Sequence, residues 1–419
     1  MRVLVNGEPC EVLKNEACCY VVRSLREHAD RVQVEVIPEA AVAVTGVQLR
    51  PLSAGIACRL SEGRICFEAA VPAKLSLEFP DGALPLFLFL YQPEEAPAGE
   101  RVRYLAPGEH RMDRLELHSG DTLYLAEGAV LHAPVGATDA ENVTVCGRGI
   151  LDVEECGDRA RRPFHFIRSR NLTVRDITIT GSRGWCCVFT GCENVTVDGV
   201  NIISWRCTGD GVDIVGSHDV TVQGCFLRTA DDCVAIKAAG YADPAGMQNV
   251  YGIAVRHCVM WNAQPGNGIE IGFETRCDEI HHVVFEDIDL IHCEHEGWQS
   301  GGAITIHNGD RARIHDILYR DIRVEDACDK LFDFKVMRSN YSRDDTRGCI
   351  EDVTVERVAI VSGAFPPSIL SGYMPEDSLV RRVRFSGITA YGRPLLSALE
   401  CRMICERTKE ITFEKGNHE

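Results

Sequence analysis

Apolar and polar residues alternate in three segments near the middle of the chain. The segments begin at Asp210, Asp232 and Asn267, and each carries Val or Ile at its third and fifth positions. A period of two residues is typical of a β-strand with one buried face. If the three strands stack in register, these positions form two inward columns, and the polar residues between them face outward.

A short unit recurs after residue 141. It consists of a polar or small residue, then Val, Ile or Leu, any residue, and Val or an aromatic residue. The copies begin at Asn142, Asn171, Asn194, Asp219, Gly252, His282, Asp316, Asp352, Arg382 and Glu410. Repeats at such a spacing indicate a solenoid. The copies show strand periodicity and almost no helical periodicity, so we predict an all-β chain built on a right-handed parallel β-helix.

The N-terminal part has a different pattern. Residues 1–95 contain short alternating runs separated by turn residues, which predicts a small antiparallel β-sandwich. The segment 91–101 is rich in Pro, Glu and Ala and is interpreted as a linker or rim loop. The predicted domains are therefore the sandwich, 1–95, and the β-helix, 96–419.

Composition narrows the possible partners. The 419-residue chain has a formal net charge of −18, which argues against nucleic acid or an anionic membrane, because both require a basic face. The 20 cysteines include no CxxC pair and are expected to be mostly reduced core residues. No signal peptide is visible, so a cytoplasmic location is expected. No pattern indicates a cofactor or an oligomeric state.

The outward polar residues suggest hydrolytic chemistry. Asp210 and Asp232 are one short coil apart, which places them on adjacent strands about 5 Å apart, with Asp231 beside them. Closely placed carboxylates do not all ionise readily, so one is expected to stay protonated near neutral pH. An acid beside a base is the equipment for cleaving a glycosidic bond with water.

Two structural interpretations remain open for this acidic patch. Asp is common in turns, and a stack of Asp residues can form corners without catalysing anything. The second interpretation is a calcium site, because Asp210, Asp213, Asp231, Asp232 and Glu270 all offer hard oxygen ligands. The predicted site itself contains no metal, and calcium binding is the alternative to it.

The run from about Arg103 to Val336 resembles the polygalacturonase family of glycoside hydrolases, family 28, and its dextranase and isopullulanase relatives. The family pattern is Asn-Thr-Asp-Gly, Gly-Asp-Asp, Gly-His-Gly and Arg-Ile-Lys. This chain has Thr-Gly-Asp-Gly at 208–211, Ala-Asp-Asp at 230–232, Gly-Asn-Gly at 266–268 and Thr-Ile-His at 305–307. The resemblance implies a pectin-lyase-like fold, with Asp231 as general acid. It also implies that Asp210 and Asp232 hold and activate the water, with inversion at the anomeric carbon.

The chain departs from the family at two motifs. Asn267 stands where the family has His, and Thr305 and His307 stand where it has Arg and Lys. Because Arg and Lys suit carboxylate recognition, we expect a substrate other than plain polygalacturonate. The predicted substrate-binding residues are Asp213, Lys237, Asn267, Glu270, His307, Trp185 and Trp205.

The predicted function is hydrolysis of the O-glycosidic bonds of an oligosaccharide or polysaccharide. We expect the sandwich to close one end of the binding groove, which favours exo action. One alternative is a polysaccharide lyase on the same fold, which requires a uronate substrate. Another is a non-catalytic carbohydrate-binding solenoid, because the fold alone does not specify chemistry.

Overall fold

The computed structural model describes residues 1–39, 46–294, 301–374 and 377–416. Strands dominate these ranges, and the helices are short 3-10 turns: η1 (Leu52–Ala54), η2 (Pro80–Gly82), η3 (Glu154–Ala160) and η4 (Pro244–Met247). Within the described ranges, no helix is both long and apolar enough to cross a lipid bilayer. All twenty cysteines lie in these ranges and are free thiols.

The first ten strands form two five-stranded sheets that face each other across an apolar core. One sheet has the order β2 (Glu8–Cys10), β1 (Arg2–Val5), β5 (Arg31–Ile37), β8 (Arg64–Ala70) and β7 (Arg59–Ser61). The other has the order β3 (Leu13–Lys14), β4 (Cys19–Ser24), β10 (Leu86–Tyr91), β9 (Ala73–Glu78) and β6 (Gln48–Arg50). The pairing is antiparallel except between β10 and β4. One of the short alternating runs expected within residues 1–95, at 41–50, lies partly outside the described residues, and its end forms β6.

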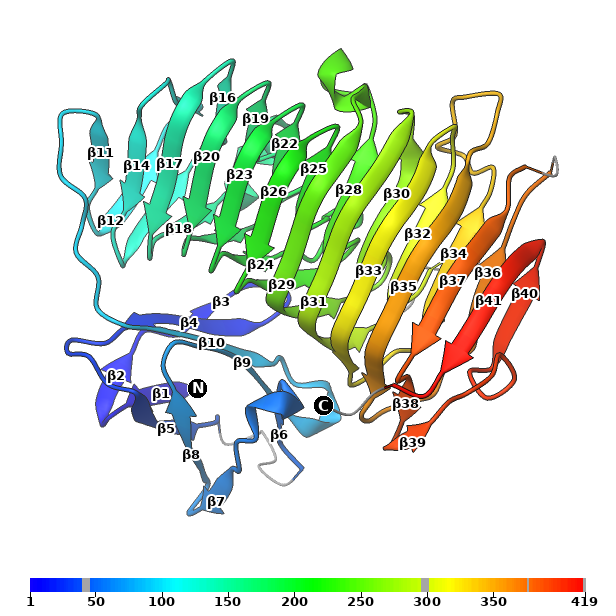
Figure 1. Cartoon of the computed structure of the whole chain (residues 1–419). Helices are drawn as coiled ribbons and strands as arrows, with labels where there is room; N and C mark the ends of the chain where they lie inside the picture. The colour runs from blue at the N-terminus through cyan, green and yellow to red at the C-terminus, as the bar shows by residue number, and fades with distance from the viewer. Residues whose placement is uncertain (40–45, 295–300, 375–376, 417–419) are drawn as a thin grey trace.

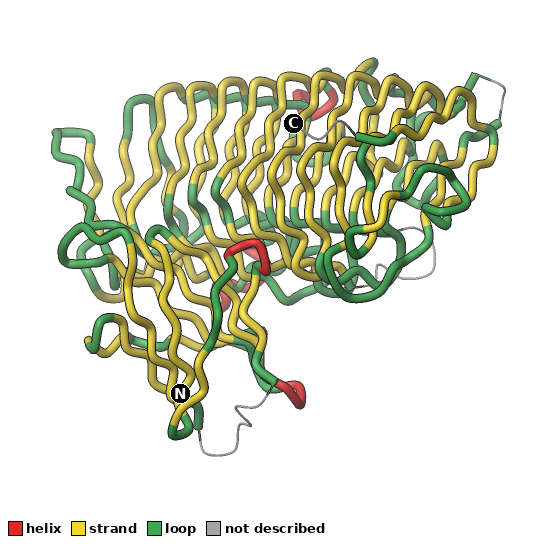
Figure 2. The backbone as a smooth tube through the Cα atoms, turned by 60° about the horizontal axis from the view of Figure 1, so that its bottom comes forward, coloured by secondary structure: helices red, strands yellow, loops and turns green. Residues whose placement is uncertain are grey.

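From β11 onward the chain winds into a parallel β-helix (Figures 1 and 2). One twenty-stranded sheet wraps two of its faces: β11 (Val102–Leu105), β12 (Gly108–Arg111), β14 (Thr122–Leu125), β15 (Ala129–His132), β17 (Glu141–Gly147), β18 (Ile150–Asp152), β20 (Arg170–Arg175), β21 (Thr178–Thr180), β23 (Glu193–Asp198), β24 (Asn201–Ile203), β26 (His218–Gln223), β27 (Phe226–Thr229), β29 (Val250–Asn262), β31 (Glu279–Cys293), β33 (Arg313–Val324), β35 (Cys349–Ile360), β37 (Val380–Ser386), β38 (Thr389–Ala390), β39 (Arg393–Pro394) and β41 (Thr408–Glu414).

The remaining face is an eleven-stranded sheet: β13 (Leu115–Glu116), β16 (Val135–Thr138), β19 (Phe164–Ile167), β22 (Cys187–Thr190), β25 (Val212–Val215), β28 (Val234–Ala238), β30 (Ile269–Thr275), β32 (Ile304–Asn308), β34 (Phe332–Val336), β36 (Ser368–Ser371) and β40 (Met403–Glu406). Its strands pair in parallel. This sheet carries the residues singled out from the sequence.

The first residue of every predicted repeat copy has a positive φ. Asn142, Asn171 and Asn194 lie at φ of 57°, 55° and 53°, and the other seven copies also fall in the left-handed region. Asn and Asp adopt this conformation more readily than most residues, which explains the polar position that opens the unit. The apolar pair that follows it points inward, so the repeat is the sequence signature of one bend and one strand.

The predicted inward columns are confirmed. Val212 pairs with Val234, and Val234 pairs with Ile269. All three side chains are fully buried in a single apolar cluster that runs along the solenoid. Because the side chains alternate, Asp213 and Glu270 must point away from this core.

The sandwich lies along one flank of the solenoid (Figures 1 and 2). Phe87 and Phe89 of β10 pack against Phe226, Ile203 and other apolar residues of the twenty-stranded sheet. Polar contacts extend this interface, including Ser53 donating to Asp289 at 2.8 Å. The sandwich therefore contacts the side of the β-helix over several coils. Our expectation that it closes one end of the groove stays a prediction.

Candidate active site

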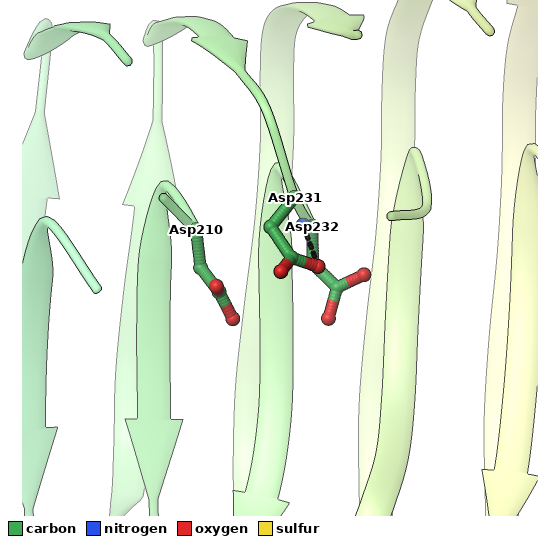
Figure 3. A group of neighbouring side chains, drawn as sticks. All are labelled: Asp210, Asp231 and Asp232. Carbon is green, nitrogen blue, oxygen red and sulfur yellow. Dashed lines mark hydrogen bonds between the residues drawn. The ribbon is translucent and has the colours of Figure 1, made fainter. Parts of the chain in front are cut away.

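Three carboxylates converge on the outer side of the eleven-stranded sheet (Figure 3). Asp210 comes from one coil, and Asp231 and Asp232 come from the next. One carboxylate oxygen from each residue lies within 4.8 Å of the corresponding oxygen of the other two. The sequence prediction that the three side chains surround one spot is thereby confirmed.

Register explains why these residues meet. Asp210 lies two residues before β25, Asp232 two before β28, and Asn267 two before β30. The backbone carbonyls of Asp210, Asp232 and Asn267 each accept a hydrogen bond from the preceding coil, at 2.8–3.1 Å. Equal offsets in stacked strands place the side chains in one row along the solenoid. We call these positions, together with the adjoining Asp231, the catalytic row, after the role that we propose for its carboxylates.

Lys237 neutralises part of the negative charge. Its Nζ donates to Asp210 Oδ2 at 2.6 Å and lies 3.2 Å from Asp213 Oδ1. Lys237 is 5% exposed and Asp213 is fully buried, so neither matches the predicted role of substrate contact. Burial, followed by the charge of Asp210, holds the pKa of Asp213 well above its usual range. Together these two residues orient Asp210.

Asp231 has the properties of a general acid. Its side chain accepts hydrogen bonds from the backbone N–H groups of Thr208 and Asp232, each at 3.1 Å. It is partly exposed, whereas Asp210 and Asp232 are buried. Burial and then the charge of Asp210 raise the pKa of Asp231 to about 7. A carboxylic acid with this pKa can hold a proton at neutral pH and donate it to a leaving group.

Gly266 allows the next coil to approach Asp231 closely. Its φ is +104°, and a Cβ at this position would lie 2.4 Å from Asp231 Cα. No other residue type fits there without displacing the backbone that carries the acid. The first glycine of Gly-Asn-Gly therefore sets the position of Asp231.

Asn267 positions Asp232. Its backbone N–H and its Nδ2 both donate to Asp232 Oδ1, at 2.9 and 2.8 Å. Its Oδ1 accepts from the Gly302 N–H at 3.0 Å. Asn267 is 1% exposed and is hydrogen-bonded on both sides, and its role in substrate binding stays a prediction. Burial, then Asp231 and Asp210, raise the pKa of Asp232 well above its usual range.

Glu270 and His307 form a closed network in the following coils. His307 Nδ1 lies 2.9 Å from Glu270 Oε2, and its Nε2 lies 3.2 Å from Asp333 Oδ2. Thr305 also donates to Glu270. All four side chains are fully buried. Alternation turns Glu270 and His307 outward, but their mutual pairing leaves neither accessible in this structure, so a contact with sugar stays a prediction.

The two predicted tryptophans have different positions. Trp185 lies two residues before β22, with Lys237 Nζ 4.2 Å from its ring centroid, so it borders the site. Trp205 packs with the apolar cluster between the solenoid and the sandwich. Packing accounts for the burial of Trp205, and its predicted contact with substrate stays a prediction.

Sequence reasoning missed Arg162. This residue lies two positions before β19, the same offset that Trp185 and Asp210 have from their strands. Its guanidinium carbon lies 4.7 Å from the Trp185 ring centroid. The equal distance of two residues from the start of a strand could have revealed Arg162 in the sequence. Arg162 was missed because it belongs to none of the recognised motifs.

A metal ion could also be held by this group of carboxylates. Among the described residues, the His, Cys, Asp and Glu side chains that lie close enough together for this are Asp210, Asp231 and Asp232. The Lys237 ammonium already bonds Asp210 at 2.6 Å and supplies positive charge at that oxygen. The Lys237 ammonium and a divalent cation would therefore compete for the Asp210 carboxylate.

The comparisons with known proteins concern this same region. The model of Glycosyl hydrolases family 28 matches residues 152–364, just over half of the chain. A polygalacturonase of Chamaecyparis obtusa is 29% identical over 160 residues, covering 36% of this chain and 29% of that protein. The chain thus spans less than a third of that relative's length.

Two solved structures share the fold. Dex49A from Penicillium minioluteum has a TM-score of 0.65 at 15% identity, covering 90% of this chain and 79% of that one. An exopolygalacturonase from Thermotoga maritima has a TM-score of 0.56 at 16% identity, covering 74% and 84%. These similarities support the β-helical architecture.

Proposed function

Since this chain belongs to Glycosyl hydrolases family 28, we propose that it hydrolyses O-glycosidic bonds of an oligosaccharide or polysaccharide at the catalytic row. The observation that carries the proposal is the convergence of Asp210, Asp231 and Asp232 within 4.8 Å. Asp231 alone of the three is partly exposed, and its raised pKa suits an acid. We assign it to protonate the departing glycosidic oxygen.

Asp210 and Asp232 are assigned to hold and activate the attacking water. Asp210 uses Oδ2 to bind Lys237, and its Oδ1 has no hydrogen-bond donor among the described residues. Asp232 is anchored through Oδ1 by Asn267. A water between these two carboxylates would be positioned for attack as Asp231 donates its proton. The bond from the anomeric carbon to the leaving oxygen breaks while the bond to the water oxygen forms.

The proposed stereochemical outcome is inversion. Two carboxylates alone at such a short separation are more typical of retaining enzymes, in which one of them attacks the sugar. The third carboxylate changes this expectation, because two can share the water while the third acts as acid. The anomer that first appears in a proton NMR time course distinguishes the two routes.

The substrate is proposed to differ from plain polygalacturonate. Thr305 and His307 occupy the motif positions at which the family carries Arg and Lys, and both are buried and hydrogen-bonded to Glu270. Because both side chains are fully buried, neither is exposed to receive a substrate carboxylate. Exo action stays a prediction and is tested by whether internal fragments appear from a long labelled polymer.

The deciding experiment is a screen of the purified protein against neutral and acidic oligosaccharides, with Asp231→Asn alongside. We expect turnover by the native protein and a loss of kcat of about 10²- to 10⁴-fold in the variant, because it cannot donate the proton. Unchanged turnover in the variant would refute the acid assignment. Products that absorb in the ultraviolet would instead indicate elimination by a lyase.

A further inference from the structure

Three side chains that can form hydrogen bonds stand inside the solenoid, at the corner beneath the catalytic row. Thr229, Asn262 and Cys293 are the last residues of β27, β29 and β31, and they pair in register across three coils. All three are buried, and the interior that they border is a continuous apolar cluster. A buried amide or hydroxyl in such surroundings destabilises the fold unless its polar atoms are hydrogen-bonded. Their partners therefore show what these residues do.

The side-chain amide of Asn262 is satisfied by three partners. Its Nδ2 donates to the backbone carbonyl of Asp231 at 2.7 Å and to that of Pro265 at 3.1 Å. Its Oδ1 accepts from the Cys293 thiol, with 3.6 Å between oxygen and sulfur. Because a carbonyl oxygen can only accept, these partners fix the orientation of the amide. Asn262 thus joins the backbone of Asp231 to the loop that precedes Gly266.

The same Asp231 carbonyl receives a second donor, Thr229 Oγ1, at 2.6 Å. We call Thr229 and Asn262 the inner pair. Two donors on one carbonyl oxygen fix the plane of the peptide between Asp231 and Asp232, because the atoms of a peptide unit are coplanar. In a trans peptide the N–H points opposite to the C=O. The Asp232 N–H accordingly points out of the solenoid, where it donates to Asp231 Oδ1 at 3.1 Å (Figure 3).

We propose that the inner pair positions the general acid: Thr229 and Asn262 hold the Asp231–Asp232 peptide from inside the solenoid, and this peptide directs its N–H at the Asp231 carboxylate outside. Both are positioning residues, since alternation places them on the inner side of their strands, away from the substrate. Neither belongs to the motifs recognised in the sequence. The proposal rests on the role of Asp231 in the proposed hydrolase.

The directed N–H affects the proton that Asp231 carries. Burial and the charge of Asp210 raise the pKa of Asp231, whereas the charge of Lys237 and the N–H groups of Asp232 and Thr208 lower it. The Asp232 carboxylate also faces Asp231. A donor held on a carboxylate stabilises the ionised form, so the loss of that donor should raise the pKa of Asp231 further. The inner pair therefore keeps this pKa near neutrality, where an acid is most effective.

Carbon-13 NMR tests this role without any substrate. Protein labelled at the aspartate Cγ is titrated across neutral pH, and the Asp231 resonance is identified by its absence from Asp231→Asn. Asn262→Leu keeps roughly the size of the side chain and removes its donor. We expect it to raise the pKa of Asp231 by about one unit, because a hydrogen bond to a charged group is lost or weakened.

Thr229→Val is a second variant that keeps the shape of the side chain and removes the other donor. It should shift the Asp231 titration in the same direction, so the test stands even if Asn262→Leu does not fold. On the oligosaccharides of the screen above, kcat of Asn262→Leu should fall about 10- to 100-fold, while KM changes by about threefold or less. The alkaline decline of kcat/KM should move to higher pH in both variants.

Asn201→Leu is the matched control. Asn201 is also fully buried in the twenty-stranded sheet, and its Nδ2 also donates two hydrogen bonds, to the Tyr91 hydroxyl at 2.7 Å and to Thr178 Oγ1 at 3.0 Å. Neither partner belongs to the catalytic row. Loss of these bonds should lower the unfolding midpoint and leave kcat and the titration of Asp231 unchanged at temperatures where the variant is folded.

Two results would overturn the proposal: an Asp231 titration that moves in neither variant of the inner pair, or a shift in Asn201→Leu as large as that in Asn262→Leu. The second would mean that loss of any buried amide loosens the site. Failure of the hydrolase proposal gives a different result. Shifted titrations without turnover of any sugar would keep the positioning role and remove hydrolysis, whereas turnover with unshifted titrations would remove the positioning role alone.

Discussion

Two acidic clusters lie in neighbouring coils of the same sheet, and they differ in how completely their charges are paired. In the first, Asp231 is partly exposed and Asp210 keeps one oxygen without a donor among the described residues. In the second, His307 joins Glu270 and Asp333, and all three are fully buried. Their composition is similar, but only the first has capacity left for a substrate. Incomplete pairing of its carboxylates therefore distinguishes the candidate active site from the second cluster, whose charged groups pair with one another.

The largest expected effect comes from breaking the closed cluster. His307→Leu leaves Glu270 and Asp333 buried without their shared partner, and the free energy of unfolding should fall by about 3–5 kcal/mol. Activity per folded molecule should change little at a temperature where the variant is folded. Denaturant unfolding and turnover measure the two quantities.

A suitable control for that variant is His257→Leu, because His257 is exposed and pairs with Asp287 at 2.7 Å on the surface. Its effect on unfolding should not exceed about 1 kcal/mol. Equal losses in the two variants would contradict the view that the second cluster is held by buried pairing. A large loss of turnover by folded His307→Leu protein would connect that cluster to catalysis.

A smaller effect is expected from loosening the open cluster. Asn267→Ala removes the Nδ2 donor to Asp232, while the backbone N–H at 2.9 Å remains. We expect kcat to fall by about 10-fold or more, because a hydrogen bond to a charged group is worth about 1.5–3 kcal/mol. Asn267→His tests whether another donor restores the rate. If Asn267→Ala retained full kcat, Asn267 would have no positioning role.

The smallest effects are changes with pH. With its pKa near 7, Asp231 should lose its proton as pH rises through that value, and kcat/KM should decline on the alkaline side. The charges of Glu270 and Asp333 help to raise the pKa of His307 to about 9. Its contribution to stability should be complete below about pH 6.5 and be lost as pH rises towards 9.

Variants separate these two pH effects. His307→Leu should lose the alkaline decline in stability and keep the decline in kcat/KM. The native protein and the variant can be compared by unfolding midpoints and initial rates between pH 5 and 10, a range chosen around the ordinary and raised pKa values of His. If both declines disappeared together, loss of folded protein would explain the pH dependence of activity.

Much of the fold follows directly from the sequence. The repeat that opens with Asn142 predicted the solenoid, because one polar residue in the left-handed conformation and one apolar pair recur in each coil. Alternation also gave the correct inward columns. The spacing of Asp210 and Asp232 placed their carboxylates together, since stacked strands convert equal offsets into neighbouring positions.

The tertiary structure alone decided how deep each outward residue lies and what it contacts. Alternation specifies the side of the sheet, but the burial of Glu270 and His307 depends on partners from separate coils. Trp205 and Trp185 look alike in sequence, yet one packs towards the sandwich and the other borders the site. The sequence by itself therefore determined the strands, their register and the grouping of the three carboxylates. Which charged groups remain open to a substrate was decided by contacts between distant segments, because hydrogen-bond satisfaction is a property of the assembled structure.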